Sequence, residues 1–178
     1  MQYRRLVLTF AGVLAFLSAP LVSAHGDKST SGPTNFQILL ISIVISASIY
    51  FLVTRFLSSQ KYLSSPLVFT LASFTASVHI LLGLNDYLLL VGGIGVIAIM
   101  GSSLVVNFSQ WQDKMARLGL GLTVVVMFAA YFVSNHDIHY IAEDYLGITT
   151  KLAELSILVL LKKEWSQETV QNDQTMGE

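Results

Sequence analysis

Long apolar runs separated by short polar connections dominate the chain after residue 35. The five runs are Phe36–Thr54, Pro66–Leu84, Tyr87–Val106, Leu118–Ser134 and Leu146–Leu161. The first three contain 19 to 20 residues, which at about 1.5 Å per residue cross a hydrocarbon core of about 30 Å. The runs lack the period-two alternation of strands. We therefore predict an all-α fold, an integral-membrane bundle of about five transmembrane helices over residues 36–163.

The fourth and fifth runs are short, with 17 and 16 residues. The fifth reaches spanning length if its helix begins earlier, in the amphipathic stretch HYIAEDYLGITT. Residues 164–178 are polar, and we expect them to form a disordered cytoplasmic tail.

The first 24 residues have the three parts of a secretory signal peptide. Arg4 and Arg5 supply the positive charge, and an apolar core follows from Leu6 to Leu17. This core has 12 residues, fewer than the roughly 20 that a spanning helix needs. We predict cleavage after Ala24, with an uncleaved membrane anchor as the alternative. Either form leaves residues 25–35 as an extracytoplasmic tail.

Composition supports a membrane protein and excludes several other classes. Charged residues make up 12% of the chain, about half the usual share, and the mean hydropathy is +0.65. The net charge is −1 and the sequence shows no basic patch, so we predict no nucleic-acid partner. The chain has no cysteine, which rules out disulfides and thiolate metal sites.

Basic residues give the orientation of the predicted helices. If residue 25 is outside, the cytoplasmic connections carry six basic residues, namely Arg55, Lys61, Lys114, Arg117, Lys162 and Lys163. The outer segments carry two, Lys28 and, at the membrane edge, Lys151. This bias predicts a multi-pass protein of the cell membrane with its N-terminus extracytoplasmic and its C-terminus cytoplasmic.

Histidines and carboxylates gather on the outer side of this topology. His25 lies in the tail, and His136 and His139 lie in the connection SNHDIHYIAEDY with Glu143. Spacings of three and four residues put the last three on one face if this segment continues the fifth helix outward. Two imidazoles and a carboxylate suit copper, zinc or iron, and a solvated polar loop is the alternative.

A second candidate site lies inside the predicted membrane region. His79 and Glu154 are each about 9 to 10 Å below the outer surface. Because an ionisable group at this depth needs a partner, we expect the two to face each other as a hydrogen-bonded pair or as shared metal ligands. In the alternative, Lys151 snorkels and bridges Glu154 at i,i+3 while His79 bonds a backbone carbonyl.

Cleavage after Ala24 would make His25 the first residue, with a free α-amine beside its ring. An amine and an imidazole nitrogen form a chelate that suits Cu(II). The start HGDKS (residues 25–29) resembles the mature N-terminus of the B subunit of the particulate methane and ammonia monooxygenases, where the N-terminal histidine joins a His-x-His pair in a copper site. Here the pair is His136-x-x-His139, and large soluble β-domains are missing. The resemblance implies an accessory subunit of such a complex, for which the archaeal ammonia monooxygenase is a candidate.

The first hypothesis is therefore a small integral-membrane accessory subunit of a copper-dependent oxidase or monooxygenase complex. Its partners would be the lipid bilayer and other integral-membrane subunits. Its cofactor would be copper. The alternatives are a small metal-ion transporter and a haem- or quinone-associated electron-transfer subunit. A catalyst acting alone is not expected, because the chain shows no nucleophile–base constellation.

Overall fold

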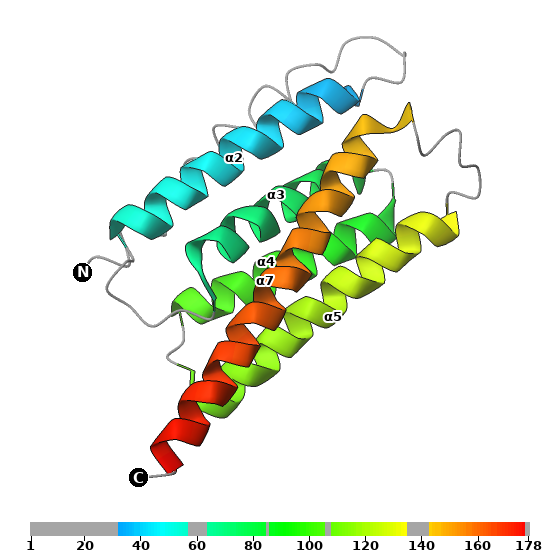
Figure 1. Cartoon of the computed structure of the whole chain (residues 1–178). Helices are drawn as coiled ribbons and strands as arrows, with labels where there is room; N and C mark the ends of the chain where they lie inside the picture. Colours follow the sequence, from blue (N-terminus) through cyan, green and yellow to red (C-terminus); the bar gives the residue numbers. More distant parts are fainter. Residues whose placement is uncertain (1–31, 57–63, 85, 106–107, 135–142, 177–178) are drawn as a thin grey trace.

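The fold was analysed in a computed structural model, which describes residues 32–56, 64–84, 86–105, 108–134 and 143–176. Five helices account for most of these residues (Figure 1). They are α2 (Asn35–Phe56), α3 (Pro66–Leu82), α4 (Tyr87–Val105), α5 (Gln110–Ser134) and α7 (Tyr145–Met176). Because the described segments contain helices and no strand, the prediction of an all-α fold is confirmed. The predicted signal peptide, His25, His136 and His139 lie outside the described residues.

The helices alternate in direction, so their ends and connections gather at two ends of the bundle (Figure 1). We call the end where α2 and α7 begin the Asn35 end, and the opposite one the Arg55 end. Ile38, Val78 and Leu146 share one apolar cluster, which places the start of α2 beside the last turns of α3 and the start of α7. The central helix is α3, which packs against α2, α4 and α7.

Three helices are long and apolar enough to cross a membrane, namely α2, α4 and α5. α3 is apolar but shorter, with 17 residues. α7 is apolar from Tyr145 to Leu161 and becomes polar beyond Leu161. Many large apolar side chains on α2, α4, α5 and α7 are exposed, as expected for helices whose outer faces contact lipid.

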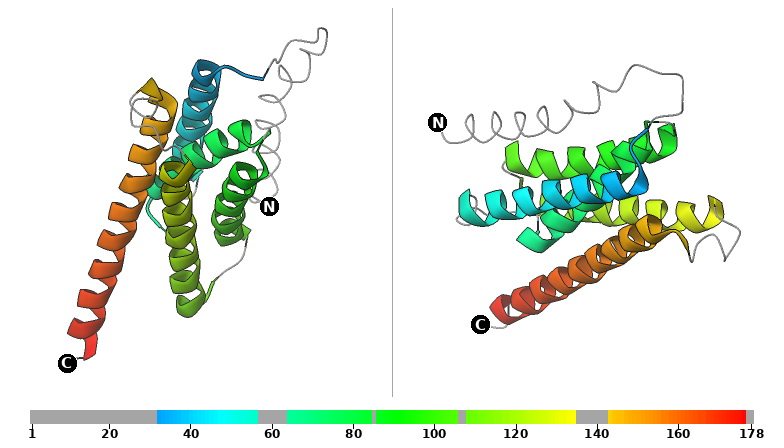
Figure 2. Two further views of the ribbon diagram at one scale, coloured as in Figure 1. Left: turned by 90° about the vertical axis from the view of Figure 1, so that its right-hand side faces the viewer. Right: turned by 90° about the horizontal axis from the view of Figure 1, so that it is seen from above.

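Two helix boundaries differ from the sequence-based expectation. α5 begins at Gln110, eight residues before the predicted Leu118, because its first two turns are helical but polar. The expected disorder of residues 164–178 was wrong, since α7 continues to Met176 and extends past its neighbours (Figure 1; Figure 2, left). No proline or glycine interrupts the sequence between Leu161 and Met176, and extending an existing helix costs much less than nucleating one.

Reciprocal capping boxes begin two of the membrane-spanning helices. At α2 the Thr34 N–H donates to Gln37 Oε1 (2.9 Å) and the Gln37 N–H donates to Thr34 Oγ1 (3.3 Å). Ser109 and Gln112 make the same pair of bonds at α5, at 2.9 and 3.4 Å. Each box satisfies backbone N–H groups that the first turn of a helix leaves without intrahelical partners.

The helices α3 and α4 meet at Gly93. A Cβ at this position would lie 2.7 Å from Cγ1 of Ile80 and 2.8 Å from the carbonyl oxygen of Ala76. The absence of a side chain therefore lets the two backbones approach closely, as small residues do in membrane helix pairs. At Gly101, further along the same helix, a Cβ would meet nothing within 4 Å.

We expect Gly93→Val to destabilise the bundle by about 1–3 kcal/mol, the usual cost of overpacking. Gly101→Val is the matched control, because it adds the same atoms to the same helix in open space. Thermal unfolding of both variants in one detergent measures the difference. Equal melting temperatures would mean that α3 and α4 are not in the contact described.

Candidate functional site

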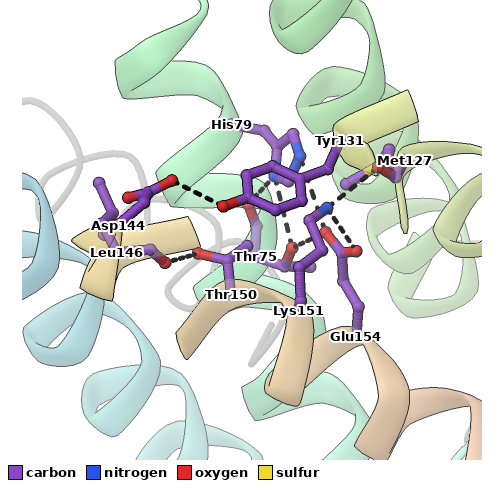
Figure 3. Close-up of polar contacts among 9 residues, drawn as sticks. All are labelled: Thr75, His79, Met127, Tyr131, Asp144, Leu146, Thr150, Lys151 and Glu154. Atoms are coloured by element: carbon purple, nitrogen blue, oxygen red, sulfur yellow. Dashed lines mark hydrogen bonds and ion pairs between the residues drawn. The ribbon is translucent and has the colours of Figure 1, made fainter. Parts of the chain in front are cut away.

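Most serine and threonine hydroxyls within the described helices bond within their own helix, while Ser42 Oγ is buried without a partner. Ser46, Ser48, Thr54, Thr70, Ser73, Ser77, Thr123, Thr149, Thr150 and Ser156 each donate to the carbonyl four residues earlier. This bond hides a polar group within its own helix, where lipid offers no partner. Thr75 instead donates across to α7. It marks the candidate site, a buried polar network between α3, α5 and α7 (Figure 3).

Glu154 of α7 is at the centre of this network and has no exposed surface. Its Oε1 accepts a hydrogen bond from Thr75 Oγ1 at 3.0 Å. Its Oε2 accepts one from Lys151 Nζ at 2.7 Å. Both carboxylate oxygens are thus bonded, which is what a charge in a dry interior requires.

Lys151 lies one turn before Glu154 and is 7% exposed. Its ammonium group also donates to the main-chain oxygen of Met127 on α5, at 3.0 Å. The same nitrogen lies 5.2 Å from the ring centroid of Tyr131 and 5.9 Å from that of Phe128, within the range of cation–π attraction. The snorkelling of Lys151 in the alternative arrangement does not occur, since its head group points into the bundle.

His79 of α3 faces the other oxygen of Glu154. It is 4% exposed, and its Nε2 is 3.7 Å from Glu154 Oε1. Its Nδ1 is 2.8 Å from the carbonyl oxygen of Thr75. Because a carbonyl oxygen can only accept, Nδ1 carries the proton, and Nε2 is protonated only in the imidazolium form.

The structure combines features of both arrangements considered from the sequence, without the snorkelling of Lys151. The structure brings His79 and Glu154 face to face, as the depth argument expects. It also contains the Lys151–Glu154 bridge at i,i+3 and the bond from His79 to a carbonyl. The sequence analysis did not identify Thr75 and the Met127 carbonyl as members of the buried polar network. The helical spacing of four between Thr75 and His79 was the available sign for the first, because it puts both on one face.

The network lies between two apolar clusters. Ile38 and Leu146 belong to the cluster toward the Asn35 end. Ala72, Ile157 and Leu161 belong to the larger cluster toward the Arg55 end. A further polar contact toward the Asn35 end joins Tyr131 to Asp144, whose Oδ2 accepts the tyrosine hydroxyl at 2.9 Å.

Of the predicted outer metal ligands, the structure describes Glu143 alone. It is exposed and precedes α7. Asp144 accepts the N–H of Gly147 at 2.9 Å, an N-cap bond that begins a new helix. The shared face of His136, His139 and Glu143 required the fifth helix to continue outward through Glu143, and α7 instead begins at Tyr145. Among the described residues, no three His, Asp or Glu side chains are grouped closely enough to hold a metal ion.

Comparisons with known proteins give no relative for this chain. No family model matches it, and neither a curated protein nor a solved structure does. The functional argument therefore rests on the residues and their geometry.

We expect Thr75→Val to destabilise the bundle by about 1.5–3 kcal/mol, because it leaves a buried carboxylate oxygen without its donor at unchanged side-chain shape. Thr70→Val is the control, since Thr70 lies on the same helix and bonds only its own backbone, at Pro66 O. Chemical unfolding in mild detergent compares the two variants. Equal losses would show that the Thr75–Glu154 bond contributes nothing beyond a local hydroxyl.

Lys151→Met should destabilise the bundle by about 3–5 kcal/mol, because it strands the carboxylate of Glu154 in an apolar interior. The double variant Lys151→Met/Glu154→Leu should recover most of this loss, since a buried ion pair replaced by apolar groups is often neutral. A double-mutant cycle of unfolding free energies measures the coupling. Additive effects of the two single variants would contradict a direct ion pair.

Proposed function

We propose that this chain is a small integral-membrane accessory subunit of a copper-dependent membrane oxidase or monooxygenase complex, ammonia monooxygenase being one candidate. In this proposal a signal peptide is removed after Ala24 and five helices span the cell membrane. The N-terminus is extracytoplasmic and the C-terminus cytoplasmic. His25, His136, His139 and Glu143 bind or deliver copper at the outer face.

The observation that carries the proposal is the chemical difference between the two ends of the bundle. α2 begins, α5 ends and α7 begins at the Asn35 end (Figure 1). The segments that contain His25, His136 and His139 are therefore attached to this one end, which also has Asp86, Glu143 and Asp144. This attachment supports a common outer site, because imidazole and carboxylate groups are good ligands for Cu(II).

Two further features support a subunit over the alternatives. The buried network is already bonded internally, and the larger apolar cluster around Ile157 and Leu161 separates it from the Arg55 end. A polar route for a metal ion is therefore missing among the described residues. For a haem held between helices, His79 is the single histidine in the described helices, and it is bonded to Thr75 and faces Glu154.

The test is copper binding by the full-length protein purified from membranes and measured by elemental mass spectrometry. We expect the double variant His136→Ala/His139→Ala to bind copper more than about tenfold more weakly, since losing ligands should cost at least as much as losing their supporting contacts. One additional residue before His25 in the mature chain should also lower the occupancy, because it separates the α-amine from the ring.

His79→Gln is the matched control, since it removes one imidazole from the interior and leaves the outer groups in place. It should keep the copper content of the wild type. Equal copper in all four proteins would remove the outer site from the proposal. Purification from native membranes without any co-purifying membrane protein would remove the role as a subunit.

A further inference from the structure

The end of α5 and the start of α7 are bonded to each other at the Asn35 end. The hydroxyl of Tyr131, in the last turn of α5, donates to Asp144 Oδ2 at 2.9 Å (Figure 3). The other carboxylate oxygen, Oδ1, accepts the N–H of Gly147 in the first turn of α7, also at 2.9 Å. One carboxylate thus serves both helices. We call Tyr131, Asp144 and Gly147 the clip.

Gly147 provides the space that the clip needs. No described glycine has a positive φ, so the backbone conformation does not require glycine here. A Cβ at this position would collide with Asp144 Oδ2 and would lie 2.5 Å from the hydroxyl oxygen of Tyr131. Because glycine stabilises a helix less than alanine does, its presence in this turn is explained by the hydrogen bond between the other two residues.

The ring of Tyr131 is held from the inside of the bundle. Lys151 Nζ lies 5.2 Å from its centroid, within cation–π range. The Phe132 ring packs against it edge-on, with 5.2 Å between the centroids. Lys151 is itself bonded within the buried polar network. The hydroxyl therefore reaches Asp144 from a ring that the interior fixes, and the clip continues the buried network to the Asn35 end.

The clip joins the two ends of the segment that contains predicted copper ligands. In the sequence, His136 and His139 follow the end of α5. Glu143 directly precedes Asp144. A bond between the ends of a connection reduces the conformational entropy that the connection has left to lose. A metal site assembled in this connection would then form at a lower entropic cost, which is the effect of preorganisation.

We propose that the clip is a positioning element for the outer copper site and sets the copper affinity of that site. Tyr131 and Asp144 act through the connection and not as ligands, because the phenol and both carboxylate oxygens are bonded within the clip. This inference rests on the proposed function. It adds residues of the two helices that the ligand spacing in the sequence does not indicate.

The experiment measures the Kd for Cu(II) of the full-length protein purified from membranes, by competition with a chelator of known affinity. Tyr131→Phe removes the hydroxyl and keeps the ring. Gly147→Ala adds the Cβ that collides with the clip and removes no polar group. Each should weaken copper binding about tenfold, near the lower limit for one hydrogen bond to a charged group.

Each variant has a matched control. Tyr145→Phe removes the hydroxyl of an exposed tyrosine directly after Asp144. Gly101→Ala adds a Cβ where nothing lies within 4 Å. Neither control should change the Kd by more than about twofold, as is usual for substitutions outside specific contacts.

Two further measurements separate positioning from a loss of fold. Amide hydrogen exchange of residues 143–148 should become faster in both clip variants, while exchange in α3 stays at the wild-type rate. This readout needs no copper. The electron paramagnetic resonance spectrum of bound Cu(II) should also change in the clip variants, because a loosened connection presents its ligands at other angles. A simple loss of folded protein would lower the amount of bound copper and leave the spectrum unchanged.

The outcomes distinguish this inference from the proposed function. Wild-type copper affinity in both clip variants, with faster exchange at residues 143–148, would overturn the inference and leave the proposed function intact. Unchanged exchange would overturn the clip itself. Equal weakening in the clip variants and their controls would mean general destabilisation and would also contradict the inference. A wild-type protein that binds no copper would remove the proposed function and this inference together.

Discussion

The buried ion pair between Lys151 and Glu154 is the constraint on which the bundle depends. A single ionisable group at membrane depth costs roughly 2.5–3.5 kcal/mol on insertion scales, and α7 carries two such groups one turn apart. They are tolerated because each charged atom has a partner on another helix: Thr75 of α3 for the carboxylate and the Met127 carbonyl of α5 for the ammonium. The pair therefore fixes α7 against both neighbours, which purely apolar contacts in lipid do weakly.

The rest of the interior is arranged around this pair. The apolar clusters lie on either side of it, so the polar network is enclosed along the helix axes as well as laterally. The close approach at Gly93 keeps α4 against a neighbouring face of α3, one residue around from Thr75 and His79. The central helix is thus held by two different means, by small-residue packing toward α4 and by charge-assisted hydrogen bonds toward α7.

The sequence predicted the first three helices to within two residues at each end, because their apolar runs coincide with the helices themselves. It failed at the start of α5 and the end of α7, since hydropathy marks the edge of the apolar region and a helix can continue beyond it as a polar helix. The pairing of His79 with Glu154 followed from depth alone. The sequence could not predict which carboxylate oxygen of Glu154 faces Lys151 and which faces His79, because this depends on how α3, α5 and α7 are rotated about their axes relative to one another.

The buried position of Lys151 also bears on orientation. When basic residues are counted along the sequence, Lys151 is assigned to the outer face. There it reduces the difference in the number of basic residues between the two sides. Its ammonium group is bonded inside the bundle to Glu154 and to the Met127 carbonyl. Lys151 is therefore not one of the cations beside the membrane surface. With this residue set aside, the proposed topology has Lys28 as its one outer cation, against six on the other side. Local neutralisation within α7 thus strengthens the proposed topology, because the orientation rule counts charges beside the membrane and not those enclosed within it.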